Sequence, residues 1–192
     1  LARAGFQPQP VERGAGERCI VGFGGTGGPP MMNVLYNNNY QIIQAKDHVV
    51  IVVEMNHDAR IIPLGDAKQE NPQWLGNSKG RWEGDTLVVE TTNFNPGESL
   101  RTFFQNSYLL SPDAKVIERF SRIGDTQILY QFSVDDPKLF SQVWKAVMIF
   151  NQSKQPAYEY ACHEGNYALP GILAGARKNE KLCLTNYAEE GE

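Results

Sequence analysis

Two histidine–carboxylate pairs are the residues of this chain best suited to acid–base chemistry. His57 and Asp58 precede Arg60 in an expected turn, and His163 and Glu164 lie at the end of an expected strand. Histidine titrates nearest neutral pH, so it can act as an acid, a base or a metal ligand. If the two segments meet at one end of a sheet, these five side chains form a candidate catalytic site. The simpler interpretation is that His57 and Asp58 cap a turn and that His163 bonds a backbone carbonyl.

Neither a metal nor a cofactor is expected. His48, His57 and His163 lack any local spacing typical of a metal site. Residues 22–27 match the G-x-G-x-x-G pattern of dinucleotide sites, but that pattern requires a helix directly after it. Pro29 and Pro30 follow instead, so the sequence argues against a nucleotide site.

A second group of residues is suited to binding a small ligand. Its members are Tyr36, Asn38, Tyr40, Glu54 and Tyr167. Residues 36–40 offer amide and ring contacts to a sugar or an aromatic ligand, although they could equally form an Asn-rich turn. Glu54 ends an apolar run, where burial would raise its pKa or require Arg60 as an ion-pair partner.

Short strands must position these residues. Strands are predicted at 40–44, 48–55, 59–64, 128–134, 143–150 and 158–163, and at the apolar runs beside two Gly-Asp-Thr segments. In those segments, at residues 84–86 and 124–126, Gly-Asp favours the tight turns that join paired strands. A helix is expected after Pro170, running to about residue 182.

These elements predict a mainly β fold. At least seven strands, joined mostly by hairpins, describe an antiparallel meander that closes into a lipocalin-like barrel, with one short C-terminal helix. A β-sandwich is the alternative. Residues 1–33 are rich in Gly and Pro and are expected to form an irregular N-terminal arm, and residues 34–192 a single β-rich domain.

Composition excludes several classes of partner. The net charge is −4, from 18 basic and 22 acidic residues without a large block of either sign, so nucleic acid is not an expected partner. No apolar run approaches the roughly 18 residues needed to span a bilayer, which predicts no membrane insertion. The residues alone do not decide the redox state of the three cysteines. They would form one disulfide and one free thiol in an oxidising compartment, or three buried thiols in the cytosol.

Four segments together resemble a large family of exported bacterial proteins without an assigned activity. They are Y-N-N-N-Y at 36–40, E-M-N-H-D-A-R-I-I at 54–62, W-L-G-N-S-K-G-R-W-E-G-D-T-L-V-V-E-T-T-N-F at 74–94 and Y-E-Y-A-C-H-E-G-N-Y at 158–167. The resemblance covers roughly residues 17–180. It implies a periplasmic or extracellular location, a disulfide between Cys19 and Cys162, and a signal peptide and further N-terminal stretch that this chain lacks. It implies no reaction.

The resulting expectation is an exported β-barrel that binds a small organic molecule. One alternative is a metal-independent lyase, isomerase or hydrolase in which His57 and His163 act as acid and base and Arg60 holds an anion. Another is a structural or assembly protein, a homo-oligomer that uses the N-terminal arm and exposed strand edges for contacts between subunits.

Overall fold

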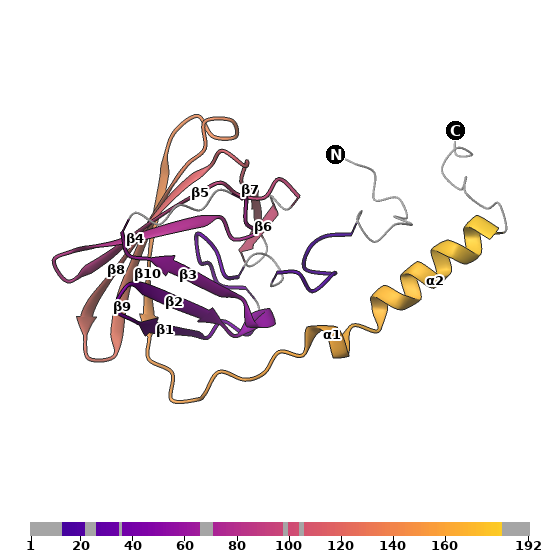
Figure 1. Ribbon diagram of the computed structural model, residues 1–192, viewed down its shortest axis with the longest axis horizontal. Helices are drawn as coiled ribbons and strands as arrows, with labels where there is room; N and C mark the ends of the chain where they lie inside the picture. Colours follow the sequence, from indigo (N-terminus) through magenta and orange to yellow (C-terminus); the bar gives the residue numbers. More distant parts are fainter. Residues whose placement is uncertain are drawn as a thin grey trace.

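Ten β-strands and two α-helices form the regular structure of the described part of the chain (Figure 1). The computed structural model describes residues 13–21, 26–34, 36–65, 71–97, 100–103 and 106–181. All strand pairs within the three sheets are antiparallel, and both helices follow the last strand. The predicted mainly β class with antiparallel strands and a C-terminal helix is therefore confirmed. None of the described helices is long and apolar enough to cross a membrane.

Two sheets make up the body of the protein, and a separate hairpin lies beside them. The smaller sheet has the order β1 (Tyr40–Gln44), β2 (His48–Val53) and β3 (Ala59–Pro63), with a 3-10 turn at Met55–His57 before β3. The larger sheet has the order β10 (Trp144–Asn151), β9 (Gln127–Asp135), β8 (Lys115–Gly124), β5 (Thr86–Thr92) and β4 (Asn77–Glu83). The hairpin of β6 (Leu100–Phe103) and β7 (Asn106–Leu109) is inserted between β5 and β8 in the chain.

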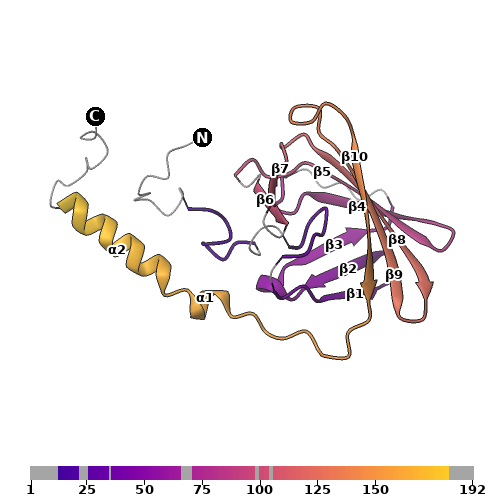
Figure 2. The same cartoon turned by 180° about the vertical axis from the view of Figure 1, so that it is seen from behind.

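The smaller and the larger sheet, whose arrangement is seen from behind in Figure 2, share one hydrophobic core. Alternate residues of β2, β8 and β9 are buried, as the period of a strand requires when one face is covered. The fully buried members include Val49, Ile51 and Ile62 of the smaller sheet and Val89, Val116, Tyr130 and Val134 of the larger one. The sheets therefore face each other across their apolar sides.

The edges of the two sheets meet differently on the two sides of this core. Beyond the end of β3, Leu64 forms an isolated parallel bridge with Gly80 of β4. A Cβ at Gly80 would lie 2.9 Å from side-chain atoms of both Ile62 and Leu64, so only glycine permits this approach. On the other side the rings of Tyr40 and Phe150 stack with centroids 5.5 Å apart. Ring packing replaces strand pairing at that seam, and the described strands do not form the predicted closed barrel.

The two Gly-Asp-Thr segments form hairpin turns in different registers. Glu83 pairs with Thr86, which places Gly84 and Asp85 in the first turn, and Gly84 has a φ of 59°. In the second hairpin Gly124 pairs with Gln127, so Asp125 and Thr126 form the turn instead of Gly-Asp. A register irregularity between Arg122 and Gly124 accounts for this one-residue shift.

The C-terminal part of the chain leaves the sheet after β10 (Figure 1). The predicted strand at 158–163 is wrong: residues 152–161 contain neither helix nor strand, and α1 (Cys162–Gly165) follows. The amide of Tyr160 bonds His57 instead of a neighbouring strand, which explains the difference. The helix α2 (Ala168–Lys181) begins two residues before Pro170, which its first turn tolerates.

The predicted N-terminal arm, residues 1–33, is described at residues 13–21 and 26–33, where it forms turns and bends without a helix or strand. Its later part enters the core, since Thr26 and Met31 are fully buried. The amide of Met31 donates a 2.8 Å hydrogen bond to the hydroxyl of Tyr130 on β9. This segment therefore packs inside the body of the protein.

Candidate functional site

A buried ion pair joins the two sheets. Arg60 on β3 and Glu118 on β8 both occupy inward-facing positions, and their side chains are 1% and 0% exposed. Nη1 of Arg60 donates to Oε1 of Glu118 at 3.0 Å, and Nη2 donates to Oε2. The same two nitrogens also reach the carbonyl of Gly27 at 3.4 Å and Oγ of Ser78 at 3.5 Å. Among the described residues, Nε of Arg60 has no partner.

Tyr130 completes this network. Its hydroxyl donates to Oε1 of Glu118 at 2.7 Å and accepts the amide of Met31. Burial, and then the adjacent carboxylate of Glu118, raise the pKa of Tyr130 well above its usual value. Burial by itself would lower the pKa of Arg60, but the charge and hydrogen bonds of Glu118, together with smaller effects of Tyr130 and Tyr40, raise that pKa overall. The guanidinium is therefore held charged and is already neutralised by Glu118.

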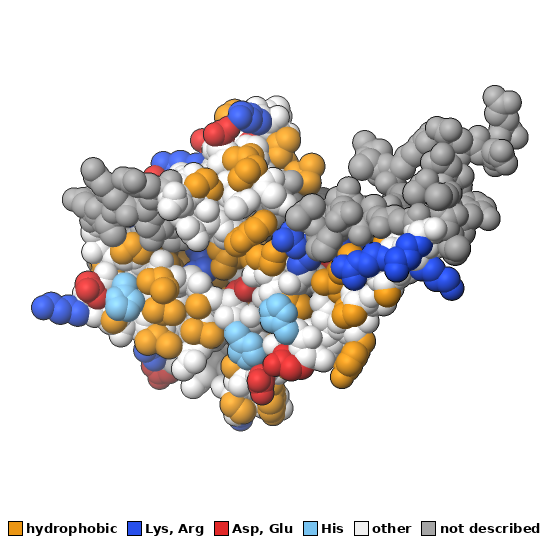
Figure 3. Space-filling view, turned by 45° about the vertical axis from the view of Figure 1, so that its right-hand side comes forward, with side chains coloured by type: hydrophobic (Ala, Val, Ile, Leu, Met, Phe, Trp, Pro, Cys, Tyr) orange, Lys and Arg blue, Asp and Glu red, His pale blue; other side chains and the backbone are white. Residues whose placement is uncertain are grey.

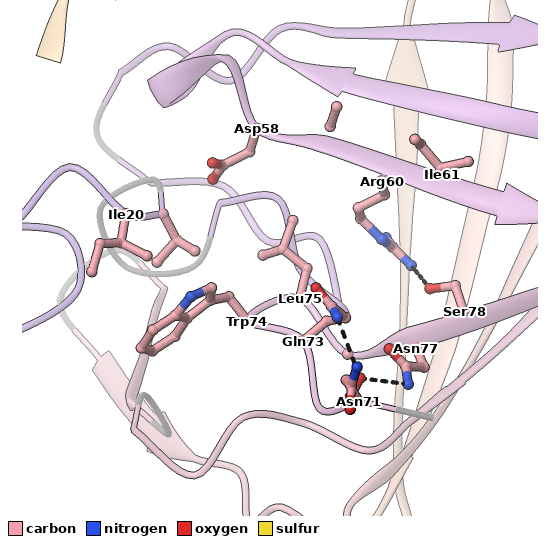
Figure 4. A pocket seen from close by; sticks show the side chains of 13 residues that line it. Ile20, Asp58, Arg60, Ile61, Asn71, Gln73, Trp74, Leu75, Asn77 and Ser78 are labelled. Atoms are coloured by element: carbon pink, nitrogen blue, oxygen red, sulfur yellow. Dashed lines mark hydrogen bonds between the residues drawn. The ribbon is translucent and has the colours of Figure 1, made fainter. Parts of the chain in front are cut away.

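Arg60 also forms part of the wall of a pocket of about 530 Å³, which we name the Trp74 pocket (Figure 4). Three segments far apart in the sequence enclose it: the N-terminal arm, the start of β3, and the loop that leads into β4. The described lining residues are Ile20, Val21, Asp58, Ala59, Arg60, Ile61, Asn71, Gln73, Trp74, Leu75, Gly76, Asn77 and Ser78. The volume lies within the range of about 300–1,000 Å³ found for small-molecule sites.

Hydrogen bonds to one carbonyl shape the loop in this wall. The backbone oxygen of Asn71 accepts from Nε2 of Gln73 at 3.3 Å and from Nδ2 of Asn77 at 3.0 Å. Gly76 has a φ of 71°, and a Cβ there would lie 2.6 Å from a methyl carbon of Thr91. The turn therefore requires glycine. Asn71 and Gln73 are exposed, and the side-chain amide of Asn71 and Oε1 of Gln73 make no hydrogen bond to a described residue, so a ligand can reach both.

His57, His163 and Glu164 line a second, smaller pocket of about 240 Å³, which we name the His57 pocket. Figure 3 shows histidine side chains close together beside acidic ones on this face. Nε2 of His57 accepts the amide of Tyr160 at 3.2 Å, so a neutral His57 carries its proton on Nδ1. Asp58 and Arg60 line the Trp74 pocket instead. The structure thus divides the five candidate catalytic residues between two pockets.

Cys19 and Cys162 form a disulfide in the wall of the His57 pocket, which confirms the predicted pairing. Nδ2 of Asn166 donates to the carbonyl of Glu17 at 2.7 Å and supports the same junction. The disulfide therefore fastens the N-terminal arm to the segment that precedes α2. Cys183 lies outside the described residues.

The candidate ligand-binding residues do not gather at one pocket. Tyr40 packs partly buried against the core, and burial raises the pKa of its hydroxyl. Asn38 bonds both the amide and the carbonyl of Val34, which stabilises its own loop. Tyr36 and Tyr167 are 52% and 84% exposed at the surface.

Glu54 is buried without the expected partner. Its carboxylate oxygens accept from Nδ2 of Asn37 at 2.6 Å and from Nδ2 of Asn39 at 2.5 Å. The predicted Glu54–Arg60 ion pair is wrong, because Arg60 pairs with Glu118. The amides of the Asn-rich segment satisfy Glu54 instead.

Sequence reasoning missed Glu118 and the residues of the 71–78 loop. The alternation of Val116, Glu118 and Phe120 is a usable signal, because it places a carboxylate on the apolar face of a strand. A charge at such a position requires a buried partner. For Asn71 and Gln73 the sequence offers no comparable signal, because exposed polar residues are ordinary in loops.

Comparison with models of protein families, with curated proteins and with solved structures finds no match. A function for this chain is therefore inferred from the geometry of the two pockets.

Proposed function

We propose that this protein is an exported binding protein for a small organic molecule, which occupies the Trp74 pocket. The observation that carries the proposal is a pocket of about 530 Å³ with a wall of amide, carboxylate and aromatic groups. Ligand sites combine apolar surface with a few directed polar groups in this way. The buried ion pair with Glu118 holds Arg60, which lines the inner side of this wall, in one position.

Two further observations support this proposal. The facing sheets and the bridge between Leu64 and Gly80 are compatible with a lipocalin-like, incompletely closed barrel whose ligand enters from one side. The disulfide is compatible with a periplasmic or extracellular location, because such bonds persist in oxidising compartments.

A fluorescence titration tests the proposal. Trp74 lies in the pocket wall, whereas Trp82, which is 45% exposed on β4, does not. Compounds that stabilise the protein against heat are titrated against wild type, Trp74→Phe and Trp82→Phe. Binding should change the emission of wild type and of Trp82→Phe, and the change should be largely lost in Trp74→Phe. Equal responses in both variants would place the ligand elsewhere.

An acid–base enzyme is the second candidate. The observation that favours it is the convergence of His57 and His163, with Glu164, on the His57 pocket. The volume of about 240 Å³ is below the usual range for ligand sites, so this candidate ranks second. Hydrolysis of chromogenic esters and glycosides by wild type should be abolished in both His57→Gln and His163→Gln. Turnover that survives in both variants would exclude this pocket as its source.

A further inference from the structure

The wall of the Trp74 pocket lacks an uncompensated positive charge among its described residues. Arg60 is the one cation among those residues, and both oxygens of Glu118 neutralise it inside the core. Anion sites instead direct a free guanidinium, an ammonium group or backbone amides at the ligand. The electrostatics of this wall therefore disfavour phosphates and carboxylates.

The available polar groups suit hydroxyl groups. A side-chain amide offers both donors and acceptors, and the amide of Asn71 is free to use both. Gln73 contributes its Oε1, which makes no hydrogen bond to a described residue. A hydroxyl group also both donates and accepts, so a ligand with several hydroxyls can satisfy this set.

The apolar part of the wall suits the flat face of a ring. Trp74 and Leu75 are consecutive, partly exposed residues on the loop before β4, and their side chains extend in different directions (Figure 4). A Cβ at Gly97 would lie 3.2 Å from Cη2 of Trp74, so the backbone at Gly97 packs closely against the indole. This contact holds the ring in place. A held aromatic surface beside polar groups matches a ligand with one apolar face and a hydroxylated edge.

We propose that the Trp74 pocket binds a neutral, hydroxylated ring compound, a monosaccharide or disaccharide. This inference rests on the proposed binding function and specifies its ligand class. The C–H face of the sugar ring lies against the indole of Trp74. Its hydroxyls exchange hydrogen bonds with the side chains of Asn71 and Gln73.

Calorimetric titration with defined probes tests this class. The neutral probes are D-glucose, N-acetyl-D-glucosamine and cellobiose; the anionic probe is D-glucose 6-phosphate, and the apolar probe is laurate. The pocket variant is Asn71→Ala/Gln73→Ala. The matched control is Gln127→Ala/Asn151→Ala, which removes an exposed pair of bonded amides on the β9–β10 edge.

At least one neutral probe should bind wild type and the control equally, and the pocket variant about tenfold or more weakly. Binding of glucose 6-phosphate or laurate alone, weakened in the pocket variant, would overturn the sugar class and leave the proposed binding function intact. Binding that the pocket variant does not weaken would overturn both. Failure of every probe to bind at about 10 mM would overturn the sugar class. The dissociation constant would then lie above the millimolar range expected even of a weak binding site. The fluorescence titration described above then decides the binding function separately.

Discussion

Replacing Glu118 with glutamine removes the charge that neutralises Arg60 while it preserves the shape of the side chain. In the variant the amide NH2 faces the guanidinium, so two donors oppose each other where a carboxylate accepted two hydrogen bonds. Tyr130 keeps an acceptor in the remaining amide oxygen. The change therefore isolates the ion pair from the rest of the network.

The expected cost is large because the pair is enclosed. The two side chains are 1% and 0% exposed, so water screens neither charge. Removal of one partner of a buried pair costs about 3–5 kcal/mol. The whole folding free energy of a domain is about 5–15 kcal/mol, so Glu118→Gln should lose a large part of it.

Urea unfolding at pH 7, followed by tryptophan fluorescence, measures this cost. Glu83→Gln is the matched control, because Glu83 pairs with Arg81 and Arg119 at the surface. The control should leave the unfolding midpoint nearly unchanged. Arg60→Met/Glu118→Leu should be less destabilised than Glu118→Gln, because it buries no unpaired charge. A cost for Glu118→Gln below about 1 kcal/mol, the value typical of surface pairs, would refute this reasoning.

Three further predictions concern backbone, pH and redox state. Gly84→Ala should destabilise the protein by roughly 1 kcal/mol, and Gly76→Ala should destabilise it by more. Both glycines have positive φ, but at Gly76 a methyl group would also lie 2.6 Å from a side-chain carbon of β5. Thermal unfolding of the two variants compares them, and equal losses would show that crowding by β5 adds nothing to the backbone strain. Because the pKa of Tyr130 is raised, its contribution is complete below pH 10, where the unfolded tyrosine is still protonated, and is lost as pH rises toward the folded pKa. Above pH 10 the free energy of unfolding should fall less steeply with pH in Tyr130→Phe than in wild type, by up to about 1.4 kcal/mol per pH unit. Equal slopes in the two proteins would exclude Tyr130 as the cause of the fall. Cys19→Ser/Cys162→Ser opens a loop with a sequence separation of 143 and should cost up to about 5 kcal/mol in urea unfolding, whereas an unchanged midpoint would show that the arm is held by other contacts.

Much of the fold followed from local patterns. Strands at 40–44, 59–64 and 143–150 were predicted within about one residue of β1, β3 and β10, because alternation and turn residues act over short distances. The pattern failed at 158–163. There, hydrogen bonding of Tyr160 to His57, 103 positions away, decided the structure.

The candidate site was less predictable. Asp58 and Arg60 were singled out from their types, and both line the Trp74 pocket. Their roles were not predictable, since Arg60 was expected to meet Glu54 or an anion. The structure instead gives it Glu118.

The sequence by itself determined the mainly β class and the approximate positions of most strands. Because side chains alternate along a strand, the sequence indicates which of them share a face, but it does not indicate which element packs against that face. Only the tertiary structure joined Arg60 to Glu118, 58 positions apart, and brought residues 20–21, 58–61 and 71–78 around one pocket. Such contacts depend on how two sheets face each other, and that arrangement is fixed by the packing of the whole core.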